Sequence, residues 1–252
     1  MNYLIVISYT VLMLLGHETK THESRNIINS SIAVEKKNPN VNHDLWTDLL
    51  QMHVSVDGNV DYNGFKTNTQ KLEEYIGLLA INIPNNNWSK KEKLAYWINA
   101  YNALTVDLII RNYPVKSIKD IKNPWKQRLW KLGYKTYSLE EIEHDILRKM
   151  NEPRIHFAIV CASYSCPKLQ NKAFIAEDLE TQLTTATKEF LADKNRNEIS
   201  ENSIELSKIF SWFSKDFTEN GTLIEFLNQY SIVQISPNAK KRFKDYNWAL
   251  NE

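Results

Sequence analysis

The chain has 252 residues, of which 42% are hydrophobic and 24% are charged. That length and composition are typical of an ordinary globular protein with one sizeable domain. The formal net charge of +1 gives no electrostatic basis for binding nucleic acid, so we expect no nucleic-acid partner.

Residues 1–17 have the character of a signal peptide. Residues 3–15 form an apolar run that only Ser8 and Thr10 interrupt. The run is too short to span a bilayer, but it has the length of a signal peptide's hydrophobic region. No Lys or Arg precedes it, and Gly16 is a small residue at which cleavage could occur. The alternative is a buried N-terminal strand or helix.

We predict export to the periplasm or the cell exterior, with no stable membrane span after the signal is cleaved. Intact-mass analysis of the protein from its native host should find a chain that begins after the apolar run and before His43. A mass that includes Met1, or that begins at Asn2, would contradict export.

The folded domain is expected over residues 44–251, after a polar linker over residues 18–43 that is rich in Asn, Ser, Lys and Glu. Apolar residues at helical spacing follow Asp44. An Asp57-Gly58 turn between alternating apolar residues then predicts a hairpin over residues 54–62.

Residues 89–114 predict a buried central helix. Ser89 and Glu92 form a capping box, and Pro114 stops the helix. Asp107 is the only charged residue between residues 94 and 110, so we expect burial around most of the helix. Asn99 and Asn102 flank its apolar stripe. Buried amides need partners, so these two either bind neighbouring backbone or orient a ligand.

A second capping box opens a helix over residues 138–150, and Glu143 falls inside its apolar stripe. A carboxylate on an apolar face requires a cation, hydrogen-bond donors or a raised pKa. Arg154 and His156 follow shortly afterwards in the sequence. We therefore predict that Glu143 is buried and paired with one of these two residues.

Residues 155–162 are nearly all apolar and rich in β-branched and aromatic residues, which predicts a buried strand closed by a turn at residues 163–167. This segment contains His156 and both cysteines of the chain, Cys161 and Cys166. Side chains alternate along a strand, so a regular strand would place His156 and Cys161 on opposite faces.

The two cysteines enclose four residues of turn composition, and a fold-back could bring them within the reach of a disulfide. A regular strand that continued past Ala162 would instead carry the sulfurs apart. We predict two free thiols.

The later part of the chain predicts an amphipathic helix over residues 177–193, a short strand at residues 204–206 and another helix over residues 222–230. Together these elements predict a single α+β domain, in which a small, mostly antiparallel sheet is packed by helices around the buried central helix.

Several motifs resemble, in order, the domain-of-unknown-function family 547. They are Trp97-Ile-Asn-Ala-Tyr-Asn-Ala103, Ile142-Glu-His144, Arg154-Ile-His-Phe-Ala-Ile-Val-Cys-Ala-Ser163, Ser165-Cys-Pro167 and the terminal Tyr246-Asn-Trp248. The resemblance covers about residues 44–251 and implies a domain, but no activity.

A remoter similarity is to papain-like and transglutaminase-like folds, in which the nucleophile lies at the start of a buried helix. Residues 94–110 contain no Cys, so such chemistry would have to reside at Cys161 or Cys166.

Three functions fit these residues. The first is a thiol-dependent hydrolase or acyltransferase with Cys161 or Cys166 as nucleophile, His156 as base and Glu143 orienting it. Its substrate would be a small molecule or peptide, bound by Asn99, Asn102, Ser163 and Arg154.

The second function is a non-enzymatic exported binding or structural module with a buried Glu143–His156 pair. The third is metal binding through His156, Glu143 and either His144 or a cysteine. Because these residues lack the spacing of a strong metal motif, we expect no metal and no cofactor.

Overall fold

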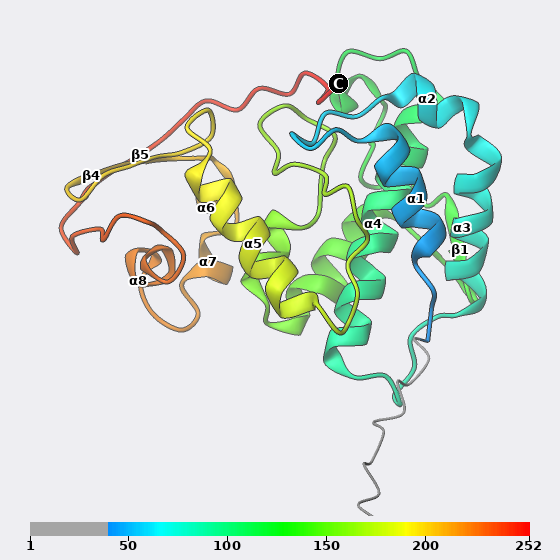
Figure 1. The fold of residues 1–252 in the computed structure, drawn as a ribbon, viewed down its shortest axis with the longest axis horizontal. Helices are drawn as coiled ribbons and strands as arrows, with labels where there is room; N and C mark the ends of the chain where they lie inside the picture. Colours follow the sequence, from blue (N-terminus) through cyan, green and yellow to red (C-terminus); the bar gives the residue numbers. More distant parts are fainter. Residues whose placement is uncertain (1–39) are drawn as a thin grey trace, which may run out of the picture. The chain divides into compact units, whose positions relative to one another are not determined.

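The structure is a computed structural model and describes residues 40–252 (Figure 1). The predicted signal peptide and nearly all of the predicted linker lie outside the described residues. Within residues 40–252, none of the helices has both the length and the apolar character needed to cross a bilayer. The α+β class is confirmed, because helices predominate and the strands form two small sheets.

The first half of the domain is helical. It contains α1 (Asp44–His53), α2 (Tyr62–Thr67), α3 (Thr69–Ile81) and α4 (Lys90–Asn112), followed by the 3-10 turn η1 (Ile118–Asp120). The middle contains β1 (Trp130–Leu132), β2 (Lys135–Tyr137), the π-helix η2 (Glu141–Leu147) and the 3-10 turns η3 (Arg148–Met150) and η4 (Pro153–Phe157). The last part contains α5 (Leu179–Ala192), β3 (Glu198–Ile199), β4 (Ser203–Leu206), α6 (Ile209–Trp212), α7 (Ser214–Phe217), α8 (Leu223–Asn228) and β5 (Lys240–Phe243).

Helix α4 is the central element, as the sequence predicts. The Ser89–Glu92 capping box is formed at its start, and every residue from Leu94 to Ile110 is buried. Helices α1, α2 and α3 lie on one side of α4, and α5, α6 and α7 lie on the other (Figure 1). The buried Asp107 accepts hydrogen bonds from Arg111 and from the indole of Trp130, both at 2.6 Å, so its charge is compensated.

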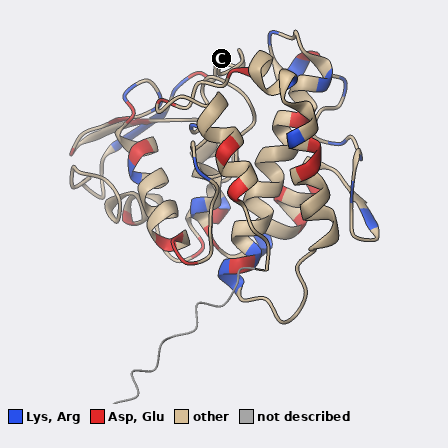
Figure 2. Ribbon diagram, turned by 45° about the vertical axis from the view of Figure 1, so that its right-hand side comes forward, with Lys and Arg blue, Asp and Glu red and all other residues tan. Residues whose placement is uncertain are grey.

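The sheets are small. Strands β1 and β2 form an antiparallel hairpin. In the second sheet, β4 pairs antiparallel with β3 and parallel with β5. The hairpin predicted at residues 54–62 is reduced to a single bridge between Val54 and Val60. Lys and Arg are interspersed with Asp and Glu over the elements seen in Figure 2, in keeping with the small net charge.

The strand predicted at residues 155–162 is wrong. Pro153 instead begins the 3-10 turn η4, and Glu152 caps it. The backbone beyond this turn is satisfied by a side chain: the Asn102 amide donates to the Ala158 carbonyl at 2.8 Å and accepts from the Val160 amide at 3.0 Å. The apolar run therefore reflects burial against α4 rather than strand pairing, an ambiguity inherent in short apolar segments.

The helix predicted at residues 138–150 also differs from a regular α-helix. The capping box of Ser138 and Glu141 is present, but residues 141–147 are π-helical and the end is a 3-10 turn. Single π-turns inside helices are frequent at functional sites. Here the π-helix contributes both Glu143 and His144 to the wall of a cleft.

Candidate functional site

A cleft among the described residues has a volume of about 680 Å³. Its wall combines α4, the loop after η1, the π-helix η2, the segment after η4, α6 and the C-terminal segment. The four residues predicted to act in catalysis, Glu143, His156, Cys161 and Cys166, all line this cleft.

The two cysteines lie in contact, with 2.9 Å between their sulfur atoms. Both are free thiols in the structure, but the argument behind that prediction is wrong, because the chain does not continue as a strand. Ala162 has a φ of 57°, in the left-handed region, and the Cys166 amide donates to the Ser163 carbonyl at 3.0 Å. This turn folds Cys166 back onto Cys161.

Polar groups surround the thiol of Cys161. Its sulfur lies 2.9 Å from the Cys166 sulfur, 3.0 Å from the Ser163 hydroxyl and 3.2 Å from the Tyr246 hydroxyl. The hydrogen bond with Cys166, together with those from Ser163 and Tyr246, outweighs burial and lowers the pKa of Cys161 to about 7. Burial, followed by the hydrogen bond and charge of Cys161, raises the pKa of Cys166. Cys161 is therefore the more acidic thiol and the better candidate nucleophile.

His156 is paired with Asp216, which corrects the predicted pairing with Glu143. Its Nε2 lies 2.8 Å from an Asp216 carboxylate oxygen, and only 1% of its side chain is exposed. The ring stacks on Phe213, with 4.1 Å between centroids, and packs against Phe217. Within residues 40–252, His156 makes no hydrogen bond to either thiol.

Asp216 is also held by Arg148, whose Nε and Nη2 each donate to one carboxylate oxygen at 2.7 Å. Burial by itself would raise the pKa of Asp216, but the hydrogen bonds and positive charge of Arg148 and His156 hold it well below its usual range. Arg148 Nη1 also lies 2.7 Å from the ring of His144. The result is a charge network that reaches the cleft at His144 and His156, whereas Arg148 and Asp216 do not line it.

Glu143 is buried, as predicted, but its partner is a hydroxyl group. Tyr101 donates to the Glu143 carboxylate at 3.0 Å, whereas Arg154 and His156 are occupied by other carboxylates. Burial first, and then the negative charges of Glu143 and Cys161, raise the pKa of Tyr101.

None of the four residues predicted to bind substrate lines the cleft, and each makes hydrogen bonds to other parts of the domain. Asn102 holds the segment after η4, and Asn99 binds the Phe174 backbone in the same two-bond manner, at 2.7 and 2.9 Å. Ser163 is fully buried and bonded to Tyr246.

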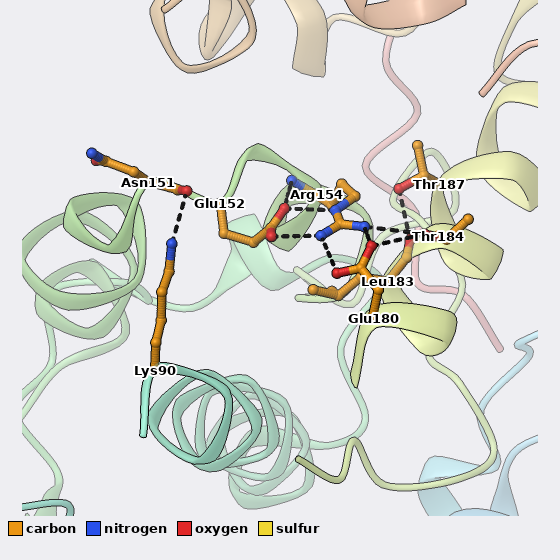
Figure 3. Close-up of polar contacts among 8 residues, drawn as sticks. All are labelled: Lys90, Asn151, Glu152, Arg154, Glu180, Leu183, Thr184 and Thr187. Atoms are coloured by element: carbon orange, nitrogen blue, oxygen red, sulfur yellow. Dashed lines mark hydrogen bonds and ion pairs between the residues drawn. The ribbon is translucent and has the colours of Figure 1, made fainter. Parts of the chain in front are cut away.

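Arg154, the fourth of these residues, lies in a separate ion cluster that joins η4 to α5 (Figure 3). It donates to both oxygens of Glu152 at 2.7 Å and to Glu180 at 2.5 and 2.9 Å. Thr184 accepts a further hydrogen bond at 3.0 Å.

Sequence reasoning missed two groups of residues. Asp216 and Tyr246 follow their partners by 60 and 85 residues, a separation that no local pattern reveals. The C-terminal motif, quoted above only for its resemblance to the family, forms part of the cleft wall. Its Trp248 contacts Trp212 and Trp125, at 5.7 and 5.9 Å between centroids.

The metal hypothesis gains no support from the geometry. Among the side chains that the structure describes, no three His, Cys, Asp or Glu residues converge as they would around a metal ion.

Residues 85–191 match the family model described as "Protein of unknown function, DUF547". This range runs from just before α4 to the end of α5 and includes Glu143, His156, Cys161 and Cys166, but not Asp216 or Tyr246. Neither the curated proteins nor the solved structures include a match, so the similarity to papain-like and transglutaminase-like folds stays a prediction. The chain therefore contains a DUF547 domain, in agreement with the resemblance of its motifs.

Proposed function

We propose that the chain is an exported, thiol-dependent enzyme, a hydrolase or acyltransferase in which Cys161 is the nucleophile. The observation that carries the proposal is the position of the Cys161 thiol on the cleft wall, in contact with three polar hydrogen-bonding groups. A thiol with a pKa near 7 is substantially ionised at neutral pH, and the thiolate is the reactive form.

The chemistry follows from the neighbours of this sulfur. The Cys161 thiolate attacks an acyl carbon and forms a thioester, and the leaving group takes up a proton. Water then releases the acyl group in a hydrolase, whereas an acceptor amine, alcohol or thiol does so in a transferase. Nε2 of His156 faces the Asp216 carboxylate. When the ring is neutral and Nε2 carries the proton, Nδ1 is free to accept one. Nδ1 can therefore act as the general base that activates the water or acceptor in the second step.

The aromatic lining of the cleft indicates what kind of substrate it could hold. Four aromatic residues line it: Trp125, Trp212, Tyr246 and Trp248. The Lys119 ammonium lies 4.4 Å from the centroid of the Trp248 ring. Flat apolar surfaces of this kind bind apolar or aromatic groups. We propose an acyl substrate with an apolar body, such as a small ester or thioester or a peptide with a large side chain.

The proposal that the protein is exported rests on the apolar run at residues 3–15.

The test combines turnover with covalent trapping. Wild-type protein should release p-nitrophenol from aromatic and aliphatic p-nitrophenyl esters, and mass spectrometry should find the acyl group on Cys161. Cys161→Ser should lower turnover by about 100-fold or more, because the hydroxyl remains protonated at neutral pH. Ser211→Ala, an exposed substitution on α6, should leave turnover unchanged.

The pH dependence gives an independent check on the nucleophile. Alkylation of Cys161 by iodoacetamide should rise with pH and reach half its maximum near pH 7, because only the thiolate reacts. A midpoint near that of an ordinary thiol, about 8.5, together with no ester turnover, would contradict the proposal.

Such a result would favour the second candidate, a non-enzymatic binding or structural module. The observation that favours this candidate is the packing of the His156 ring against Phe213 and Phe217, because a buried ionic pair of this kind can have a purely structural role. The partner in that pair is Asp216.

A further inference from the structure

We propose that Cys161 and Cys166 form a dithiol–disulfide couple, so that the site also exchanges thiols with small disulfides that enter the cleft. The inference shares with the proposed function only the nucleophilic role of Cys161, and it adds a second activity and a role for Cys166.

The first support is the distance between the sulfurs. They lie 2.9 Å apart as thiols, and a disulfide bond is about 2.05 Å long. Bond formation therefore needs an approach of only about 0.9 Å. The Cys161 amide already donates to the Cys166 sulfur at 2.9 Å, so the backbone between them is folded for a bridge.

The second support is the anchoring of the loop that joins the thiols. Arg196 donates to the carbonyls of Tyr164 and Cys166 at 2.6 and 2.8 Å. On the other side, the Tyr164 amide donates to the Ala249 carbonyl at 2.7 Å. Because both sides of the loop are held, the sulfurs stay close without the entropy loss of closing a mobile loop.

The third support is the difference between the two sulfurs. Cys161 is half-buried, whereas Cys166 is only 4% exposed. An incoming disulfide in the cleft meets the more exposed Cys161 first, and Cys166, whose sulfur is 2.9 Å away, is placed to attack the Cys161 sulfur of the mixed disulfide. This division into an attacking and a resolving thiol is what a dithiol exchange site requires.

The reaction balances without a further reagent. The Cys161 thiolate attacks one sulfur of R–S–S–R, which breaks the S–S bond, releases RS⁻ and leaves a Cys161–S–S–R mixed disulfide. Cys166 gives up its proton, which the released RS⁻ can accept, and its sulfur attacks the Cys161 sulfur. The second RS⁻ leaves and the Cys161–Cys166 disulfide forms. The two electrons lost by the dithiol reduce the substrate disulfide to two thiols.

The experiment uses reduced full-length protein and two probes, 5,5′-dithiobis(2-nitrobenzoate) and oxidised glutathione. Wild type should rapidly release two equivalents of thionitrobenzoate without retaining an adduct. One tryptic peptide, residues 155–168, contains both cysteines, and after the reaction it should be lighter by two hydrogen atoms. Cys166→Ser should release one equivalent and keep one probe group on Cys161. Cys161→Ser should show no rapid release.

The outcomes separate the two proposals. A stable probe group on Cys161 of the wild-type protein would overturn the dithiol couple and leave Cys161 as a nucleophile. No reaction at Cys161 in the folded protein would overturn both. The wild-type peptide mass does not depend on any variant, so a misfolded Cys166→Ser protein, recognised by its circular dichroism spectrum, would not obscure the result.

Discussion

Arg154→Ala should lower the free energy of unfolding by about 3–5 kcal/mol. The guanidinium is the cation that compensates Glu152, whose side chain is only 13% exposed. Its loss would leave a desolvated carboxylate without a partner, the costly case for a buried ion pair. For a domain of this size, the melting temperature should fall by about 6–20 °C. Urea unfolding and calorimetry measure both quantities.

Glu180→Gln is the matched control, because Glu180 contacts the same guanidinium (Figure 3) with a side chain that is 63% exposed. An exposed partner of this kind contributes at most about 1 kcal/mol. The double variant Glu152→Gln with Arg154→Met should recover part of the loss, since no charge is then left buried. Equal effects of Arg154→Ala and Glu180→Gln would show that the cluster is solvated.

Asp216→Asn should also lower the free energy of unfolding strongly, by about 2–4 kcal/mol at neutral pH. It removes the charge that compensates Arg148 and leaves His156, with a side chain 1% exposed, without its carboxylate. We expect a smaller loss of stability than for a fully buried ion pair because the Arg148 side chain is 28% exposed. Asp145→Asn is the control: it changes the net charge equally, but it breaks only an exposed pair with Lys149.

The pH dependence identifies the source of the Asp216 effect. The folded-state pKa of Asp216 lies below the unfolded value of about 3.9. A lowered carboxyl pKa contributes stability above the unfolded pKa, and that contribution is lost as the pH falls towards the folded pKa. The deficit of Asp216→Asn should therefore be full above about pH 5 and shrink below about pH 4. Urea unfolding at pH 7, 5 and 3.5 measures it, and a deficit independent of pH would contradict the charge argument.

The parts of the fold that were predictable from sequence are those with strong local signals. Helix α4 has a capping box, a terminating proline and a long stretch whose only charge is Asp107, so its extent and burial follow directly from the residues. The second capping box at Ser138 also marks the correct start. The burial of Glu143 followed from helical phase, although its hydroxyl partner on α4 did not.

The rest depended on tertiary contacts. Residues 155–162 have the composition of a strand, but Asn102 satisfies the backbone there and no neighbouring strand is needed. The approach of the two thiols depends on a left-handed conformation at Ala162, which is uncommon for a residue other than glycine. The expectation that a strand continuing past Ala162 would carry the two sulfurs apart was therefore wrong. Asp216 comes from a short helix distant in sequence, and only the folded chain places it beside His156.

The origin of Tyr246 has a consequence for the newly made chain. This residue follows Cys161 by 85 positions, and ribosomes add about 5–20 residues per second. The thiols are therefore synthesised about 4–17 s before the hydroxyl that completes their surroundings. During that interval Ala249 and Leu250, which pair with the cysteine loop, do not yet exist. A nascent chain thus presents both thiols to any chaperone or oxidant before Tyr246 exists, and the hydrogen bond of Tyr246 adds to the acidity of Cys161 only after the last residues of the domain dock.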